Sequence, residues 1–363
     1  MSTENATASG FGAESGDRGR RFLSGLLSTG TIFVLLLILW IWITILNPTF
    51  AEPGPFLAYL KRSAPLVILA AGAYFVLVSG NFDLSVGSLV TVIVVVAAKL
   101  IDGESDRTWP VIVLLLLIGV TVGLVNGFIS TILRVPSFIT TLGMLLALAG
   151  LTLIISHAAP VEMPGAEVTS RVVEVHHTVN GQDIVLPERV NEVGTFATIF
   201  GAGKYSELIW ALVIVGVVQV LLSLTRWGMY TIAVGGNKHG AAEAGVKVRT
   251  VVIRNFIVCS VLAGFVGILE ATRSGSVTPD TAGAAGTMFR AVSAAVIGGT
   301  LLAGGQGTAI GALFGALFLG ILRDGLVLQG VNADYLDFIL GVAILVAMII
   351  NVYVGRVRRG SGV

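Results

Sequence analysis

One carboxylate, Asp83, stands between two long apolar segments in the stretch Gly80-Asn81-Phe82-Asp83-Leu84-Ser85-Val86-Gly87-Ser88. An ionisable side chain among membrane-like apolar segments is expensive, so it is a candidate for contact with a polar solute or for gating. The Asp-x-Ser order is also typical of a helix N-cap, in which Asp83 or Ser85 accepts from N–H groups of a helix that begins near residue 86. Both hypotheses stay open, and they make Asn81, Asp83 and Ser85 the first candidate site residues.

Three further polar side chains lie within or at the end of apolar segments. Asn126 stands in the middle of one, where an amide more often hydrogen-bonds a neighbouring helix than a solute. Glu270 and Arg273 close another segment, and they can pair across one helical turn or line the outer mouth of a pathway. A second glycine-rich stretch, 298–308, is similar in composition to 80–88 and suggests two related halves of the molecule.

Recognisable catalytic sets are missing from the sequence. It has no Gly-x-x-x-x-Gly-Lys-Ser/Thr nucleotide loop, no His-Glu-x-x-His metal motif and no Gly-x-Ser-x-Gly elbow. Cys259 is the only cysteine, so one chain can form neither a disulfide framework nor a cysteine metal cluster. His176 and His177 lack a third ligand at a clear spacing and are better explained as part of a solvated strand pair. We therefore expect no catalytic residue, no metal and no bound cofactor in this chain, and any ATP must be bound by another chain.

The composition explains why those polar residues stand out. Of 363 residues, 55% are hydrophobic and only 12% are charged, whereas soluble domains carry about 25% charged residues. The formal net charge of +1 gives no sign of nucleic-acid binding. Long apolar runs recur and predict membrane-spanning helices. They lie near 31–46, 64–79, 86–101, 110–132, 138–156, 206–224, 253–271, 290–303, 305–322 and 335–354. We therefore predict an all-α, polytopic protein of the lipid bilayer, with about ten transmembrane helices and glycine-rich breaks.

The placement of Lys and Arg predicts the orientation, because loops that face the cytoplasm retain an excess of both. Arginines precede the first apolar run, follow the fourth as Arg134 and follow the last, so we expect both termini in the cytoplasm. The acid-rich segment 157–205 falls outside by the same count, and only Lys61 and Arg62 disagree with it. The polar lead before the first run is too long for a signal peptide, and no cleavage site follows that run.

The predicted domains are a disordered cytoplasmic N-terminus (1–30), a transmembrane domain (31–355) and a cytoplasmic tail (356–363). The transmembrane domain carries the external insertion 157–205 and a cytoplasmic loop, 225–252. Within the insertion, β-branched and polar residues alternate on both sides of Asn180-Gly181, which is a hairpin signal. We therefore expect a small β-hairpin in the external insertion.

The cytoplasmic loop 225–252 contains Gly235-Gly236-Asn237-Lys238-His239-Gly240-Ala241-Ala242-Glu243-Ala244-Gly245-Val246, with basic residues on both flanks. Small residues let a partner approach the backbone closely, so we expect this loop to dock another protein. The candidate docking residues are Gly235, Gly236, Asn237, Ala241, Glu243 and Gly245.

Several stretches, taken in order, resemble the permease subunit of bacterial ABC importers for monosaccharides, of the ribose, xylose and galactoside type. They are Asp83-Leu84-Ser85-Val86-Gly87-Ser88, Asn126-Gly127, Arg134-Val135-Pro136-Ser137-Phe138-Ile139-Thr140-Thr141-Leu142-Gly143, Gly235-Gly236-Asn237 with Ala241 and Gly245-Val246, Val296-Ile297-Gly298-Gly299-Thr300, Gly304-Gly305-Gln306-Gly307 and Leu322-Arg323-Asp324-Gly325-Leu326. Each stretch is weak alone, but the ordered set spans about 60–350, nearly all of the membrane part.

The resemblance implies a homodimeric or heterodimeric permease that carries two copies of an ATPase on its cytoplasmic face. It implies a bacterial cytoplasmic membrane, ATP hydrolysis in the partner chain, and an external binding protein that delivers the sugar. It also implies contact between the Gly-Gly-Asn…Gly loop and the ATPase. The chain departs from the family pattern at Ala242, where an arginine is usual, and in 157–190, which is longer than the family's usual loop.

Two other classes of protein compete with this interpretation. A transporter coupled to protons or sodium favours several carboxylates at the membrane midplane, whereas Asp83 is nearly alone here. A membrane enzyme, such as a transferase, needs paired acids, a His–Asp set or a metal cluster at one membrane face, and none is visible. The permease is therefore the preferred interpretation, with the identity of the sugar left open.

Overall fold

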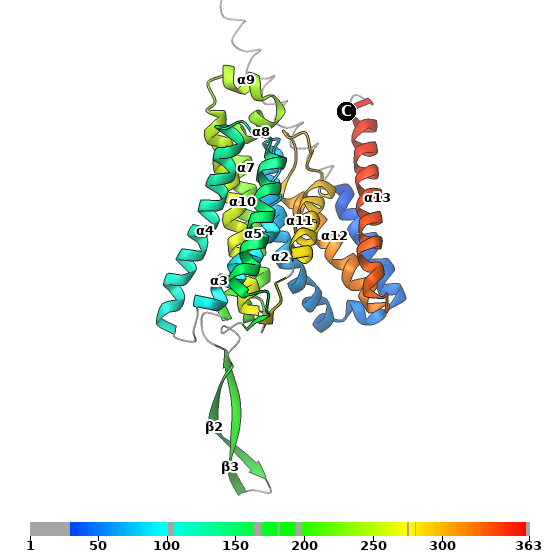
Figure 1. The fold of residues 1–363 in the computed structure, drawn as a ribbon. Helices are drawn as coiled ribbons and strands as arrows, with labels where there is room; N and C mark the ends of the chain where they lie inside the picture. Colours follow the sequence, from blue (N-terminus) through cyan, green and yellow to red (C-terminus); the bar gives the residue numbers. More distant parts are fainter. Residues whose placement is uncertain are drawn as a thin grey trace, which may run out of the picture.

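The computed structural model describes residues 30–100, 105–162, 168–179, 182–193, 198–273, 276–279 and 281–360 (Figure 1). A helix over Gly30–Leu46 comes first. The later helical elements are η1 (Pro48–Ala51), α2 (Pro53–Val78), α3 (Val86–Leu100), α4 (Ser105–Thr131), α5 (Ser137–Ser156), η3 (Thr198–Ala202), α7 (Ser206–Leu224), α8 (Arg226–Gly236), α9 (Lys238–Glu243), α10 (Val248–Arg273), α11 (Thr281–Ile297), α12 (Ala309–Leu328) and α13 (Ala333–Gly360). The predicted disordered N-terminus, 1–30, falls almost entirely outside the described residues.

An apolar helix occupies most of each segment that hydropathy predicts to span the membrane, except that 290–303 is helical only to Ile297. Among the described residues, six helices are long and apolar enough to cross a bilayer, and they lie in α2, α4, α5, α7, α10 and α12. Four shorter apolar helices, Gly30–Leu46, Val86–Leu100, Gly283–Ile297 and Tyr335–Ile350, cover the remaining predicted segments. The predicted class, an almost all-helical multi-pass membrane protein, is confirmed.

The start of α2 differs from the sequence prediction. Hydropathy places this span at 64–79, but the helix begins at Pro53, eleven residues earlier, with proline in its first turn. Lys61 and Arg62 therefore lie inside α2, where both side chains have partners. The Arg62 Nε atom is 3.4 Å from Asp324 Oδ2 on α12, and Lys61 Nζ donates to the Gly203 carbonyl at 3.3 Å. These partners explain how two basic residues are accommodated at the end where the charge rule disfavours them.

The two ends of the helical bundle carry different structures (Figure 1). At one end lie α8 and α9, and α13 terminates at the same end. At the other end strands β2 (Val168–Val179) and β3 (Gln182–Val193) project from the bundle and pair antiparallel, with Val179 opposite Gln182. The expected turn residues between them, Asn180-Gly181, lie outside the described residues. Strands β1 (Val161–Glu162) and β4 (Ser276–Val277) form a second short antiparallel pair.

The centre of the bundle is built around α2. In its most apolar stretch of eighteen residues, 83% of the residues are buried, against 28% in the corresponding stretch of α7. A helix that is apolar on all sides and buried is typical of a bundle core, whereas α7 exposes its apolar side chains as a lipid-facing helix does. The core of the molecule therefore surrounds α2, and α3, α10, α11 and α12 pack directly against it or against each other.

Among the described residues, helices α4 and α10 form the most extensive contact between two helices, and glycines allow it. Gly119, Gly123 and Gly127 follow one another at intervals of four residues on α4 and face α10. A Cβ atom at Gly123 would lie 2.6 Å from the Ile257 Cα atom, and one at Gly127 would lie 2.8 Å from the Ile253 Cα atom. Lipid tails are as apolar as leucine, so association of membrane helices depends on close packing of small residues of this kind.

Replacing Gly123 by alanine tests this contact. Gly123→Ala is expected to lower the free energy of unfolding by about 1–3 kcal/mol, because the added methyl group meets backbone atoms of α10 that cannot rotate away. Thermal unfolding of the purified protein in detergent measures the change.

The matched control for this variant is Gly143→Ala in α5, where no atom lies within 4 Å of the added Cβ. Alanine is the better helix former by about 1 kcal/mol, so this variant should be neutral or more stable. Equal stability of the two variants would remove the α4–α10 packing as an explanation.

Candidate functional site

Two of the four shorter apolar helices, α3 and α11, each border a glycine-rich break. With a rise of 1.5 Å per residue, the 15 residues of α3 extend about 22 Å and the 17 residues of α11 about 26 Å, against about 30 Å of hydrocarbon. The first break, Ser79–Ser85, separates α2 from α3, and the second, Gly298–Thr308, separates α11 from α12. Hydropathy extends the helix before the second break to residue 303, but this helix ends at Ile297. Positive φ angles at Gly299 (95°) and Gly304 (85°) turn the chain there.

Side chains of neighbouring helices satisfy the backbone of the first break. The Asn81 N–H donates to the Val76 carbonyl at 3.1 Å, and the Phe82 N–H donates to Ser137 Oγ at 3.1 Å. The Thr141 hydroxyl, one turn further along α5, donates to the Ser137 carbonyl at 2.8 Å and lies 3.4 Å from the Phe82 carbonyl. Irregular backbone at membrane depth is tolerated only where such partners, or a wet cavity, replace helix hydrogen bonds. Ser137 therefore satisfies the Phe82 N–H in the first break, a role that its position in the sequence does not reveal.

Asp83, Ser85 and Asn126 come together in a buried chain of hydrogen bonds. Asp83 Oδ1 accepts from the Ser85 N–H at 3.0 Å and from the Ser85 hydroxyl at 2.6 Å. Asn126 Nδ2, from α4, donates to the same hydroxyl at 2.9 Å. Asp83 is 3% exposed and the other two are fully buried. The Asp83 carboxylate thus orders the residue just before α3 and, through Ser85, connects α3 to α4.

Asn81 and the remaining oxygen atoms of this cluster are less constrained. The Asn81 side chain is half-buried and donates to the Ser79 carbonyl at 3.1 Å. Asp83 Oδ2 and Asn126 Oδ1 accept no hydrogen bond from the described residues. These two buried oxygen atoms therefore keep hydrogen-bonding capacity that the described residues do not use.

Two residues that the sequence analysis overlooked hold the second break. The Tyr74 hydroxyl, on α2, donates to the Gly307 carbonyl at 2.9 Å. Gln219, on α7, accepts from the Ala309 N–H at 3.0 Å and caps the start of α12 from outside that helix. Gln219 is the only side-chain amide in the apolar run of α7, and that isolation was a usable signal.

The predicted docking loop is not irregular, because α8 and α9 occupy most of it. The Thr225 hydroxyl accepts from the Gly228 N–H at 3.2 Å and starts α8, and Asn237 Oδ1 accepts from the Gly240 N–H at 2.9 Å and starts α9. Gly245, with φ of 81°, ends α9 in a left-handed turn, and the neighbouring Val246 N–H donates to the Ala241 carbonyl at 3.0 Å. Local capping signals thus convert the small-residue loop into two short helices.

The six predicted docking residues divide between the interior and the surface. Ala241 is buried and Gly235 is half-buried against other backbone segments. Gly236, Asn237, Glu243 and Gly245 are exposed, and Glu243 pairs with the exposed His239 at 3.1 Å.

Basic side chains dominate the end of the molecule that carries α8 and α9. At this end the described and exposed charged side chains are Arg134, Arg226, Lys238, Glu243, Lys247, Arg249 and Arg254. One acid among six basic residues is the charge pattern of a cytoplasmic face.

Glu270 and Arg273 form a second charged cluster in the last turn of α10. Arg273 Nη2 lies 2.8 Å from Glu270 Oε2, so the pairing that the sequence allows is present. A third member, Glu207 at the start of α7, was not predicted. Its Oε1 atom lies 3.6 Å from Arg273 Nε and the side chain is fully buried. One arginine between two carboxylates joins the start of α7 to the end of α10.

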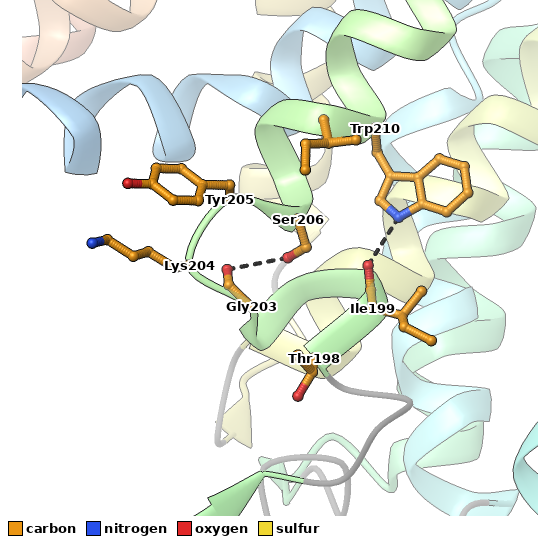
Figure 2. Close-up of a pocket in the computed structure, with 8 residues that line it drawn as sticks. Thr198, Ile199, Gly203, Lys204, Tyr205, Ser206 and Trp210 are labelled. Atoms are coloured by element: carbon orange, nitrogen blue, oxygen red, sulfur yellow. Dashed lines mark hydrogen bonds between the residues drawn. The ribbon is translucent and has the colours of Figure 1, made fainter.

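A hollow of about 410 Å³ opens beside the start of α7. It is lined by Thr198, Ile199, Gly203, Lys204, Tyr205, Ser206, Ile209 and Trp210. Figure 2 shows the Trp210 indole donating to the Ile199 carbonyl, at 3.0 Å, across this wall. The lining contains none of the predicted site residues. Among the described residues, no group of three or more His, Cys, Asp or Glu side chains could hold a metal ion.

Comparison with known proteins covers both breaks and the α8–α9 segment. A family model described as "Branched-chain amino acid transport system / permease component" matches residues 56–348. The ribose import permease protein RbsC of Escherichia coli (strain K12) is 32% identical over 338 residues, 92% of this chain and 97% of RbsC. The xylose/arabinose import permease protein XylH of Sulfolobus acidocaldarius is 30% identical over 331 residues, 90% of this chain and 85% of XylH. The galactose/methyl galactoside import permease protein MglC of E. coli (strain K12) is 31% identical over 342 residues, 90% of this chain and 94% of MglC. No solved structure matches the chain.

Two substitutions of Asp83 separate its hydrogen bonds from its charge. Asp83→Ala removes the acceptor and leaves the buried Ser85 N–H unpaired, so it should lower the free energy of unfolding by about 1–3 kcal/mol. Asp83→Asn keeps an acceptor oxygen in the same place and should unfold at nearly the wild-type temperature. Thermal unfolding in detergent measures both, and a large loss of stability in Asp83→Asn would show that the charge itself stabilises the fold.

Proposed function

The chain belongs to the family of branched-chain amino acid transport system permease components, and we propose that it is the membrane-spanning subunit of an ATP-driven ABC importer for a monosaccharide or a similar small polyol. One observation carries the proposal. The chain is at least 30% identical, over at least 90% of its length, to permeases named for ribose, xylose or arabinose, and galactose import. Similarity of this extent includes the helices and both breaks, which is what a shared transport mechanism requires.

The proposed partners follow from what the chain lacks and from the surface that it presents. ATP hydrolysis is assigned to a separate ATPase subunit, because the sequence has no nucleotide-binding loop of its own. The ATPase is proposed to dock on α8 and α9, whose exposed residues are small or basic except for Met229, Tyr230 and Glu243. A second permease copy and an external sugar-binding protein complete the proposed importer.

The orientation of the importer is part of the same proposal. The basic end of the bundle is assigned to the cytoplasm, together with the end of α13. The opposite end, with β2, β3 and the Glu207–Arg273–Glu270 cluster, then faces the binding protein in a bacterial cytoplasmic membrane.

The translocation pathway is proposed to pass the first break. Asn81, Asp83, Ser85 and Asn126 are polar groups at membrane depth, where a polar solute would need partners. Glu270 and Arg273 are proposed to border the outer mouth. Specificity for one sugar is assigned mainly to the binding protein, because the described cluster contains few side chains that could distinguish similar hydroxyl patterns.

Reconstituted transport tests the function. The permease, purified from its native host with its associated ATPase and binding protein, is placed in liposomes and supplied with D-ribose, D-xylose, D-galactose or L-leucine in turn. We expect one of the sugars to stimulate ATP hydrolysis and to accumulate inside. Stimulation by leucine alone would favour the amino acid branch of the family over a sugar importer.

The docking surface is tested in the same assay with Ala242→Trp. Ala242 is exposed on α9, so the indole ring should not disturb the interior but should prevent close approach of the ATPase. We expect sugar-stimulated hydrolysis to fall to the unstimulated rate while the protein still inserts. Ala51→Trp, at an exposed alanine beside the opposite end of α2, is the matched control and should hydrolyse ATP normally. Normal stimulation in Ala242→Trp would move the docking site away from α9.

The pathway assignment is tested by sugar uptake in Asp83→Asn. The amide can keep the hydrogen bond to Ser85 but carries no charge, so a partial loss of uptake at matched protein level is expected if the charge shapes the pathway. Wild-type uptake would leave Asp83 with its structural role alone.

A further inference from the structure

The end of α8, the end of α2 and the second break meet at five glycines: Gly80, Gly235, Gly236, Gly304 and Gly305. We call this contact the glycine junction. A direct hydrogen bond crosses it, because the Gly305 N–H donates to the Val78 carbonyl at 2.8 Å.

The segments approach so closely that a single methyl group would separate them. A Cβ atom at Gly235 would collide with the Val78 carbonyl and lie 2.6 Å from the Gly305 N atom. One at Gly304 would lie 2.7 Å from the Gly80 N atom. Gly80, Gly304 and Gly305 also have φ angles of 73°, 85° and 78°, which disfavour any residue with a side chain. Backbone therefore touches backbone, with no flexible side chain between to absorb a displacement.

Helix α8 is held at its other end by a different contact. The Trp227 indole donates to Asn255 Oδ1 on α10 at 2.9 Å, and Thr231 hydrogen-bonds the same amide at 3.3 Å. The first turns of α8 are thus hydrogen-bonded to α10, while its last residues, Gly235 and Gly236, form part of the glycine junction. A tilt of α8 about its tied end would displace Gly235 and Gly236.

The glycine junction adjoins both membrane breaks. Gly80 comes three residues before Asp83 in the first break, and Gly304 and Gly305 belong to the second. Tyr74, on α2, ties the second break to the same helix through the Gly307 carbonyl. A displacement at this contact therefore reaches the segment before α3 and the segment before α12 together.

We infer that the glycine junction is the contact through which movement of α8, produced by the docked ATPase, is delivered to both breaks, and that Gly235 is its key positioning residue. The inference rests on the proposed docking of an ATPase to α8 and α9. It adds the route by which that docking opens or closes the pathway.

Gly235→Ala is the test, in proteoliposomes that contain the permease with its ATPase and binding protein. The added methyl group should force α8 away from Val78 and Gly305, and sugar uptake per ATP hydrolysed should fall by about fivefold or more. The ATPase should remain bound, with an unstimulated hydrolysis rate like that of the wild type. A purely structural role would lower the amount of assembled complex and leave the ratio of uptake to hydrolysis unchanged.

Gly216→Ala is the matched control, since it lies on α7, outside both the proposed docking surface and the glycine junction, and no atom lies within 4 Å of its added Cβ atom. Wild-type uptake per ATP in Gly235→Ala would overturn the inference, and so would an equal loss in Gly216→Ala.

Tyr74→Phe keeps the test decisive if Gly235→Ala does not accumulate. It adds no bulk and removes the bond to the Gly307 carbonyl, so it should also lower the ratio of uptake to hydrolysis, and an unchanged ratio would overturn the inference. Absence of an ATPase from the wild-type complex would instead contradict the proposed function.

Discussion

The structure depends on one constraint: a backbone N–H or C=O at membrane depth must find a partner inside the protein. Regular helices satisfy these groups with their own backbone hydrogen bonds, but the helices are interrupted at two breaks. At the first interruption the partners are Ser137 on α5 and the side chain of Asp83, and at the second they are Tyr74 on α2 and Gln219 on α7. Each break is thereby fixed to helices far away in sequence, so the polar residues of the permease are held where they are by the same bonds that make the breaks tolerable.

Association of the helices also requires close approach of small residues. Lipid tails are as apolar as leucine, so burying apolar side chains between helices gives little stabilisation by itself. Glycines bring α4 against α10 and bring the end of α8 against Val78 and Gly305. The first contact builds a rigid unit, and the second places the end of a surface helix directly on the interrupted segments. The glycines at these two contacts are therefore required by packing.

The charged and polar groups of the bundle form three separate sets. One end carries α8 and α9 with an excess of basic side chains, the first break carries the Asp83–Ser85–Asn126 hydrogen bonds, and the start of α7 and the end of α10 carry the Glu207–Arg273–Glu270 cluster. Contacts between helices hold the second and third sets in place, because Asn126 and Glu207 come from different helices than their partners.

Hydropathy and charge are properties of short stretches, so the sequence by itself determined the number of apolar helices, their approximate positions and the polar interruption around Asp83. It also contained the capping residues Thr225 and Asn237, although the small residues around them suggested a loop. Only the tertiary structure decided that Gln219 caps α12, that Glu207 shares Arg273 with Glu270, and that Gly235 rests on Val78 and Gly305. These contacts join residues dozens to more than a hundred positions apart. They form only when the helices pack against each other, and a local sequence pattern does not specify which helices will be neighbours.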